Sequence, residues 1–384
     1  MEGEEVQRYG LRTMVGLCLL NTVSTTQLSG ITNTWGVVVI YVASYLHLYD
    51  QTANLSNLEM SYAVQSGYWC LGLRNCHTVI GSLVFSRYGG RVVLFLGVIV
   101  LVAPLLICSF LESLCPWLGL YYMSSGMGAC LVCMNSIWVS WQWYPKRKGL
   151  ATGFVMFFYG ASSAIQGMFF TLLMNPNNQR PDLKIEVGDQ EEYLFSSDIA
   201  RRLPMTLRVT AALFAVVGGV SLLMIRERGM SGEERKSLVN SIASKESKQP
   251  VHCPDLKTAL KTSSFYVLAC YSFTSYCYVG FALLQYKNYA MTKSKNDQLL
   301  SLIGSVGFIC NTITRFLVSV LMDYITFRSV SIVVMSLQIV LAATIHWVVA
   351  EPLIYMIWVS LTFICFAAVF SPVTIVCGDI YGPT

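Results

Sequence analysis

The chain has 384 residues, of which 54% are hydrophobic and only 12% are charged. Soluble domains carry about 25% charged residues, so this composition excludes an ordinary soluble domain and indicates a membrane protein. The net charge of +5 is spread over short loops, and no cluster of basic and aromatic residues indicates binding to nucleic acid.

Long apolar stretches recur along the whole chain. A membrane-spanning helix needs about 20 mostly apolar residues, and each of these stretches is long enough. We predict spans at residues 13–46, 61–85, 91–111, 117–143, 149–174, 205–225, 264–286, 298–322, 329–350 and 353–378. The sequence therefore predicts an all-α, multi-pass membrane protein that lies in a lipid bilayer.

The first stretch, 13–46, is unusually long and has a polar middle rich in Ser and Thr. Such a segment is typical of a broken or tilted helix whose polar part lines a cavity. We predict that Asn21, Gln27 and Asn33 line a substrate route there. Two separate short spans remain the alternative interpretation.

The loops alternate in charge. Those at 86–91, 145–148 and 226–262 are rich in Lys and Arg, whereas those at 47–60 and 175–204 carry an excess of acidic residues. Because basic loops stay on the cytosolic side of a membrane, we expect the N-terminus and the long segment 226–262 to be cytosolic.

The same long polar segment predicts the division into domains. We expect a six-helix bundle at 1–225, a cytosolic linker at 226–262 and a second bundle of four helices at 263–384. The linker is rich in Ser and Lys, as flexible connecting segments often are.

Two arginines, Arg74 and Arg315, lie deep inside apolar stretches that contain no Asp or Glu away from their ends. A charged side chain in hydrocarbon costs several kcal/mol, so it must face protein, water or a bound anion. A substrate carboxylate is therefore the natural counter-ion. His77, three residues after Arg74, is a candidate to carry a coupled proton, with a structural core histidine as the alternative.

The second span is followed by the sequence GSLVFSRYGGR at 81–91. This turn resembles the loop between helices two and three of the major facilitator superfamily, except that Ser86 stands where the family has Asp. The resemblance implies a tight glycine turn carrying cytosolic positive charge, in which Arg87, Gly89 and Arg91 take part in gating.

A related pattern, DYITFR at 323–328, follows the eighth span. Two such loops at corresponding positions suggest that the two bundles are repeats of one another. We therefore assign Asp323 and Arg328 to the second gating loop.

Three further stretches narrow the resemblance. The sequence WQWYPKRKGLATG at 141–153, with GITNTWG at 30–36 and FSP at 370–372, is similar to the oxalate/formate antiporter branch, which is related to the monocarboxylate transporters. This implies secondary active transport of a small mono- or dicarboxylate such as formate, oxalate, lactate or pyruvate. Anion exchange or proton symport would drive it, by alternating access.

The resemblance also implies roles for individual residues. Arg315 matches the arginine of the branch that binds the substrate carboxylate. Arg74 has no match among the family's positions; we expect it to line the same route, with gating or backbone pairing as the alternatives. A guanidinium suits this chemistry because its planar fork binds a carboxylate in a bidentate way. An arginine that reaches the cytosolic face or bonds a backbone carbonyl is the alternative. We expect the protein to act as a monomer.

The fourth and fifth spans carry residues typical of membrane helices. Three tryptophans at the cytosolic end, Trp138, Trp141 and Trp143, predict interfacial anchors. Glycines at 153, 160 and 167 share one face of the fifth span, where small residues let helices approach closely. Either static packing or a surface that slides during transport explains them.

Patterns of catalytic and cofactor sites are missing from the sequence. It has no Gly-rich phosphate loop, and its CxxC pair, Cys130 and Cys133, lies in an apolar stretch without a second pair at metal-ligand spacing. We therefore expect no enzyme activity, no cofactor and no metal ion.

Members of the superfamily have twelve spans, and here we predict four in the second bundle before the chain ends at Thr384. The sequence is then either truncated or a shortened relative that acts as a non-transporting subunit or sensor. A transporter of neutral solutes such as sugars is a further alternative, but it would leave the two arginines without an anionic ligand.

Overall fold

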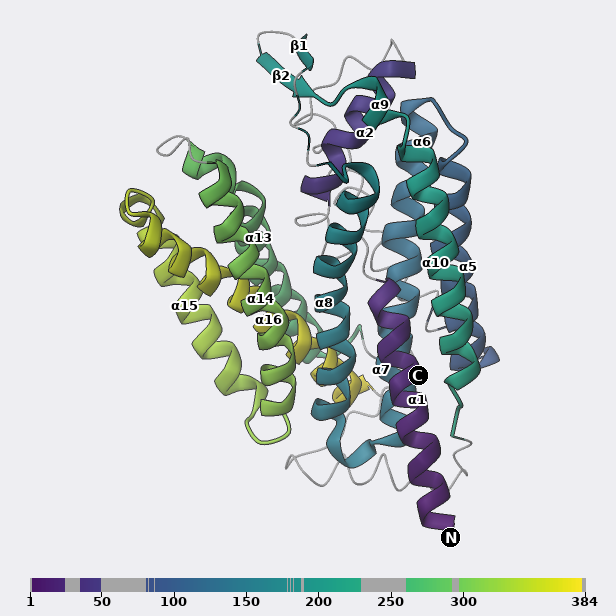
Figure 1. Cartoon of the computed structure of the whole chain (residues 1–384). Helices are drawn as coiled ribbons and strands as arrows, with labels where there is room; N and C mark the ends of the chain where they lie inside the picture. Colours follow the sequence, from purple (N-terminus) through teal and green to yellow (C-terminus); the bar gives the residue numbers. More distant parts are fainter. Residues whose placement is uncertain are drawn as a thin grey trace. The chain divides into compact units, whose positions relative to one another are not determined.

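The computed structural model describes residues 2–24, 35–49, 260–291 and 297–381, and 81–228 except for 82, 86, 178, 180, 182, 188 and 189. These residues are mostly helical, as Figure 1 shows. Five of the described helical segments are long and apolar enough to cross a membrane, namely Gly90–Cys108, Ser197–Met224, Leu302–Leu321, Phe327–Val348 and Pro352–Ile380.

The chain folds into two compact units. The first comprises Met1–Ser136 and Ala161–Glu227, and the second comprises Ile137–Gly160 and Arg228–Thr384. The turn between the fourth and fifth predicted spans thus packs with the C-terminal helices, although it lies within residues 1–225 of the sequence. The predicted division at 226–262 stays a prediction.

The first unit contains most of the N-terminal helices and the only strands in the described part of the chain. Its complete elements are α1 (Glu2–Ser24), α2 (Trp35–Tyr49), α5 (Gly90–Cys108), α6 (Leu114–Tyr122), the π-helix η1 (Met123–Gly128), β1 (Leu183–Val187), β2 (Gln190–Leu194), α9 (Ser197–Ala200) and α10 (Leu203–Met224). Helices α7 (Ala129–Trp143) and α8 (Lys148–Met174) are divided between the units, and the first unit contains their residues 129–136 and 161–174. Helix α10 packs against both α1 and α5, and α5 packs against η1.

The π-helix η1 packs closely on the backbone of α5. A Cβ atom at Gly128 would lie only 2.9 Å from the Cα atom of Leu101 on α5. The hydroxyl of Ser124, one helical turn earlier, donates a 2.6 Å hydrogen bond to the carbonyl oxygen of Leu101. Small residues at this position therefore let two helix backbones touch, as is usual for membrane helices.

The predicted loop 175–204 contains structure that its sequence pattern did not reveal. β1 and β2 form an antiparallel hairpin that pairs Leu183 with Leu194 and Val187 with Gln190. The chain then packs on α2, where the ring of Phe195 stacks on Tyr41 at 4.7 Å and its amide donates to the hydroxyl of Ser44 at 3.0 Å. The described residues are therefore helical with one small hairpin.

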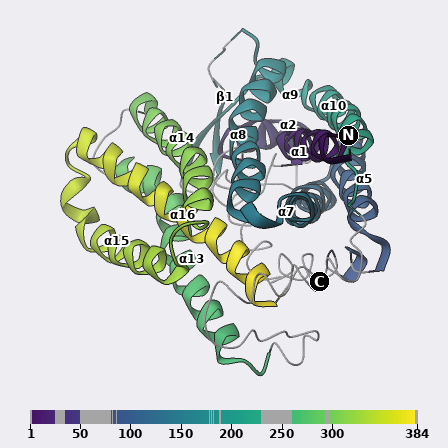
Figure 2. The same cartoon turned by 90° about the horizontal axis from the view of Figure 1, so that it is seen from below.

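Helix α16 contacts each of the other long helices at the C-terminal end of the second unit. Its helices are α13 (Ser263–Met291), α14 (Asp297–Leu321), α15 (Phe327–Val348) and α16 (Pro352–Tyr381), together with the end of α7, the short 3-10 turn η2 (Pro145–Arg147) and the first part of α8. Helix α16 packs against α13, α14 and α15, and Figure 2 shows it among them.

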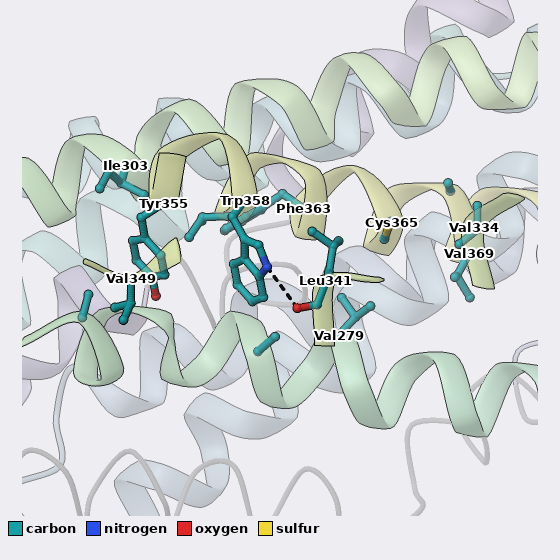
Figure 3. Close-up of a cluster of buried hydrophobic side chains, with 14 of the residues drawn as sticks. Val279, Ile303, Val334, Leu341, Val349, Tyr355, Trp358, Phe363, Cys365 and Val369 are labelled. Atoms are coloured by element: carbon teal, nitrogen blue, oxygen red, sulfur yellow. Dashed lines mark hydrogen bonds between the residues drawn. The ribbon is translucent and has the colours of Figure 1, made fainter. Parts of the chain in front are cut away.

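Aromatic residues of α16 organise the core of this unit. The indole of Trp358 donates a 3.0 Å hydrogen bond to the carbonyl of Leu341 on α15, as Figure 3 shows. The hydroxyl of Tyr355 donates to the carbonyl of Tyr286 on α13 at 2.6 Å. Because buried Tyr and Trp need partners for their polar atoms, these bonds fix the neighbours of α16 in register.

Most predicted spans match helices. The predicted boundaries agree within a few residues for α5, α8, α10, α14, α15 and α16, and α6, η1 and α7 together fill 117–143. In the first stretch, α1 ends at Ser24 and α2 begins at Trp35. Residues 25–34 and most of the predicted span 61–85 lie outside the described residues.

Candidate functional site

The centre of the second unit contains a buried cation. Arg315 lies on α14, and its side chain is only 1% exposed. Burial removes the guanidinium from water, so the groups around it decide whether its charge is tolerable and what it binds. Arg315 was predicted to contact the substrate, and the structure describes the residues around it.

Asn311, one helical turn before Arg315, holds the guanidinium. The side-chain oxygen of Asn311 accepts a 2.8 Å hydrogen bond from Nε of Arg315. Its side-chain nitrogen donates at 2.8 Å to the carbonyl oxygen of Phe363 on α16. The amide therefore ties the arginine of α14 to the backbone of α16.

Aromatic rings surround the guanidinium carbon. The rings of Phe370, Phe366 and Tyr159 have centroids 5.1, 5.6 and 5.6 Å from Cζ of Arg315. The sulfur of Met156 lies 3.9 Å from Nη1. Ring faces carry negative potential, so they stabilise a desolvated cation while keeping the surroundings apolar.

Two glycines bring α8 against the helix that carries Arg315. A Cβ atom at Gly153 would lie 3.1 Å from the carbonyl oxygen of Phe316, and one at Gly160 would lie 3.0 Å from the hydroxyl of Thr312. These glycines therefore pack closely on α14, as the sequence predicted for 153 and 160. The sliding role stays a prediction.

At one end of the unit, Asp323 caps a neighbouring helix. Its two carboxylate oxygens accept hydrogen bonds from the amides of Gly149 at 2.9 Å and Leu150 at 3.0 Å, in the first turn of α8. The first amides of a helix have no partner within the helix and carry partial positive charge, so a carboxylate is well suited to this place. The other predicted gating residue of this loop, Arg328, is exposed at the start of α15.

A second ion contact joins α8 to α16 nearby. Nζ of Lys148 lies 2.7 Å from a carboxylate oxygen of Asp379, and it also lies 5.2 Å from the ring centre of Trp141. Trp141 is 3% exposed, and its indole donates to the hydroxyl of Thr152 at 2.8 Å. The prediction that Trp141 is an interfacial anchor was wrong, because the ring is enclosed by Lys148 and Gly378.

The first unit contains the other predicted gating turn. Gly89 has φ of +87°, a conformation that residues with a Cβ rarely adopt, which confirms the tight glycine turn. The carboxylate of Glu227 accepts a hydrogen bond from the amide of Arg91, at the start of α5. The side chains of Arg87 and Arg91 are exposed.

The remaining predicted site residues are distributed as follows. Asn21 is fully buried, and its amide donates to the carbonyl of Leu17 in the same helix at 2.8 Å. Gln27, Asn33, Arg74 and His77 lie outside the described residues.

Sequence reasoning missed Asn311, Asp379 and Glu227. Asn311 is an uncharged residue four positions from Arg315, a spacing that places both on one helix face and that gave the only available signal. Asp379 lies in the last turn of α16 and Glu227 lies three residues after the end of α10, and their partners are far away in the sequence.

Comparisons with known proteins agree with this architecture. A sequence model of the Major Facilitator Superfamily matches residues 78–384. The search of curated proteins returned no match. Among solved structures, a double-tryptophan mutant of XylE is 14% identical with a TM-score of 0.66, covering 99% of this chain and 84% of that chain.

Two further structures have the same fold. XylE bound to 6-bromo-6-deoxy-D-glucose, described as a proton:xylose symporter, is 12% identical with a TM-score of 0.63, covering 97% of this chain and 82% of that chain. The fucose:proton symporter FucP of E. coli is 12% identical with a TM-score of 0.58, covering 96% of this chain and 90% of that chain. Identities this low show the fold alone. Because the matched sequence region covers most of the chain, this multi-pass membrane protein belongs to the major facilitator superfamily of transporters.

Proposed function

We propose that the protein is a secondary active transporter of small organic anions, mono- or dicarboxylates such as formate, oxalate, lactate or pyruvate. Arg315 binds the substrate carboxylate. The burial of this guanidinium, which is 1% exposed on a helix apolar enough to span a membrane, is the observation that carries the proposal. An arginine stays protonated and binds a carboxylate through two parallel hydrogen bonds.

The surroundings of Arg315 support an anionic substrate. Asn311 and the rings of Phe366 and Phe370 are neutral groups that stabilise the guanidinium without adding negative charge. In a site of low dielectric, the attraction between a fixed cation and a carboxylate is much stronger than in water. The same rings offer apolar surface to the carbon chain of a small organic acid.

Sequence resemblance supports the same substrate class. Residues 141–153 resemble the oxalate/formate antiporter branch, and this stretch contains Trp141, Lys148 and Gly149, whose contacts join α8 to α14 and α16. Asn21, Gln27, Asn33 and Arg74 complete the proposed route, and His77 is the candidate for a coupled proton.

The contacts at the end of the second unit fit a gate for alternating access. Asp323 holds the first turn of α8, and the ion pair between Lys148 and Asp379 joins α8 to α16. We infer that these contacts form in one transport state and loosen in another, together with the turns at 87–91 and 323–328. The N-terminus and residues 226–262 lie in the cytosol in this scheme.

A neutral sugar is the second candidate substrate. XylE and FucP, whose fold this chain shares, are described as symporters of xylose and fucose with protons. A sugar offers hydroxyl groups to Arg315 but no negative charge, so the buried guanidinium favours the anion.

Uptake into proteoliposomes tests the proposal. We expect the purified protein to take up labelled formate, oxalate or lactate more strongly than glucose, and Arg315→Ala to abolish that uptake. Arg201→Ala, which removes an exposed arginine next to α9, is the matched control and retains uptake. Equal uptake by Arg315→Ala and the parent would refute the role of Arg315.

The other outcomes discriminate between the alternatives. Uptake of glucose without anion uptake would support the sugar transporter. Absence of uptake of all four compounds, with the protein correctly folded, would contradict the proposal and favour a non-transporting subunit or sensor.

A further inference from the structure

The exposed face of α10 carries one charged residue in apolar surroundings. Arg208 is the only charged residue of this helix, and it is exposed on the same face as Met205, Val216 and Leu223, which are exposed as well. The helix belongs to a segment that is apolar and long enough to cross a membrane. A face of this kind contacts lipid, where a charged side chain is costly unless it reaches the headgroups.

The position of Arg208 matches the level at which the neighbouring helix α5 ends. Helices α5 and α10 pack side by side, as Figure 1 shows, and α5 ends at Cys108 with Ser109 as its capping residue. Nε of Arg208 donates a 3.1 Å hydrogen bond to the hydroxyl of Ser109, and Nη2 donates to the carbonyl oxygen of Ser109 at 3.4 Å. Because a spanning helix ends where hydrocarbon meets the lipid headgroups, these bonds place the guanidinium at the headgroup level.

Ser109 and Phe110 hold the guanidinium in one orientation. Ser109 is 2% exposed, and its hydroxyl donates to the carbonyl oxygen of Leu106 at 2.7 Å, so the hydroxyl oxygen is available to accept from Arg208. The ring of Phe110, which is 68% exposed, has its centre 4.4 Å from Cζ of Arg208. An arginine fixed in this way loses little side-chain freedom when it binds a ligand, which favours binding.

These contacts do not pair the guanidinium with a carboxylate in the part of the chain that the structure describes. Arg208 makes no ion pair there, although Glu112 lies in the loop that follows α5. Ser109 accepts from the side edge of the guanidinium, formed by Nε and Nη2, so the end edge, formed by Nη1 and Nη2, points away from Ser109. Such an edge matches the geometry of two phosphate oxygens.

We propose that Arg208, together with Ser109 and Phe110, binds the phosphate group of a membrane phospholipid. The arginine donates charge-assisted hydrogen bonds to the phosphate, Ser109 fixes its direction, and Phe110 packs on the guanidinium. The acyl chains lie along the apolar face of α10 that includes Met205 and Val216. A free phosphate ion has the same charge chemistry but makes no contact with this face, so the site favours the lipid. This proposal does not depend on the proposed transport function.

Native mass spectrometry of the full chain in a maltoside detergent measures the binding of added phosphatidylglycerol. We expect Arg208→Gln to weaken the affinity for the first bound lipid about 10-fold, because hydrogen bonds between two charged groups are lost. Arg208→Lys keeps the charge without the planar fork and should weaken it about 3-fold. Arg201→Gln, which removes an exposed arginine in the turn before α10, is the matched control and should bind the lipid as the parent does.

Two further probes distinguish the phosphate from the rest of the lipid. Diacylglycerol with the same acyl chains lacks the phosphate and should bind the parent protein about 10-fold more weakly than phosphatidylglycerol. Inorganic phosphate at the same concentration should not displace the lipid. Equal affinities for diacylglycerol and phosphatidylglycerol would refute the phosphate site, and displacement by inorganic phosphate would overturn the assignment to a lipid.

Thermal unfolding with and without phosphatidylglycerol separates binding from a structural role. If Arg208 only capped α5, Arg208→Gln would lower the unfolding midpoint by the same amount in both conditions. We expect instead that the rise in the midpoint caused by the lipid shrinks in Arg208→Gln. Equal lipid affinity in Arg208→Gln and the parent, or an equal loss of affinity in Arg201→Gln, would refute the site.

A surface variant keeps the proposal testable should Arg208→Gln fail to fold. Phe110→Ala removes an exposed ring that packs on the guanidinium, and we expect it to weaken lipid binding about 3-fold. Unchanged affinity in both Phe110→Ala and Arg208→Lys would contradict the proposal.

Discussion

Two regions of the second unit hold buried cations in different ways. The first, the gate region, comprises Lys148, Gly149, Leu150, Asp323 and Asp379. There the carboxylate of Asp379 contacts the ammonium of Lys148, and the carboxylate of Asp323 accepts hydrogen bonds from the first amides of α8. Around Arg315, the neutral amide of Asn311 and three aromatic rings hold the guanidinium.

The positive groups of the two regions therefore differ in the kind of partner that surrounds them. A cation already matched by a protein carboxylate contributes to the architecture of helix ends. In the proposed function, the cation beside Asn311 and the aromatic rings binds a carboxylate that the substrate brings. Substitutions around Arg315 should therefore affect transport more than folding, and those in the gate region should affect folding first.

The largest expected effect comes from Arg315→Lys. The lysine keeps a positive charge but loses the planar fork and the bond from Nε to Asn311, so binding of a carboxylate in two parallel hydrogen bonds is lost. We expect anion uptake at low substrate concentration to fall about 100-fold, corresponding to roughly 2–3 kcal/mol of binding free energy. Uptake assays in proteoliposomes measure it, and near-parental uptake would show that charge alone is sufficient.

Gly149→Ala should have the largest effect on stability. Its Cβ would collide with the carbonyl oxygen of Ser319 and with the carboxylate of Asp323. Overpacking of this kind costs about 1–3 kcal/mol. Gly219→Ala on α10, where no described atom lies within 4 Å of the new Cβ, is the matched control. A thermal unfolding midpoint that falls equally in both variants would argue against close packing at Gly149.

Asp323→Ala should destabilise the start of α8 somewhat less. It removes the acceptor of two amide hydrogen bonds, and loss of such a cap costs about 0.5–2 kcal/mol. Asp323→Asn keeps one acceptor oxygen and should lose about half as much. Hydrogen exchange at the amides of Gly149 and Leu150 measures the effect locally, and unchanged protection in Asp323→Ala would contradict the cap.

The smallest effect is expected at the ion pair. The carboxylate of Asp379 is 42% exposed on its side chain, so solvent weakens its attraction to Lys148, and such pairs contribute about 0–1 kcal/mol. Lys148→Met, Asp379→Asn and the double variant form a thermodynamic cycle for unfolding. A coupling energy well above about 1 kcal/mol would contradict this prediction.

The sequence predicted the features that depend on local composition. The apolar stretches of α5, α10 and α14–α16 were recognised because hydrophobic length alone indicates a span. Gly89 was placed in a tight turn because glycine tolerates positive φ. Arg315 was predicted to face protein, water or an anion because a charge in an apolar stretch is costly. Its burial inside the protein agrees with that prediction, and its substrate role stays a prediction.

Features that depend on distant partners were not recognised. The acceptor of Nε is uncharged, and only its place four residues before Arg315 in the sequence indicates that the two side chains share a helix face. Glu227 and Trp141 acquire their partners only when the chain folds, since the amide of Arg91 is 136 residues away from Glu227. The hairpin at 183–194 was missed because the excess of acidic residues favoured a loop over 175–204, although LKIEV at 183–187 alternates apolar and charged residues as a strand does.

Pro372 lies inside α16, between the aromatic residues around Arg315 and the gate region. Proline has no amide hydrogen, so the helical hydrogen bond to the carbonyl of residue 368 is missing, and helices bend at such places. Phe363, Phe366 and Phe370 precede this weak point, and Asp379 follows it. The last two turns of α16, which carry the partner of Lys148, are therefore joined to the aromatic part of the helix by one backbone hydrogen bond fewer than in an uninterrupted helix.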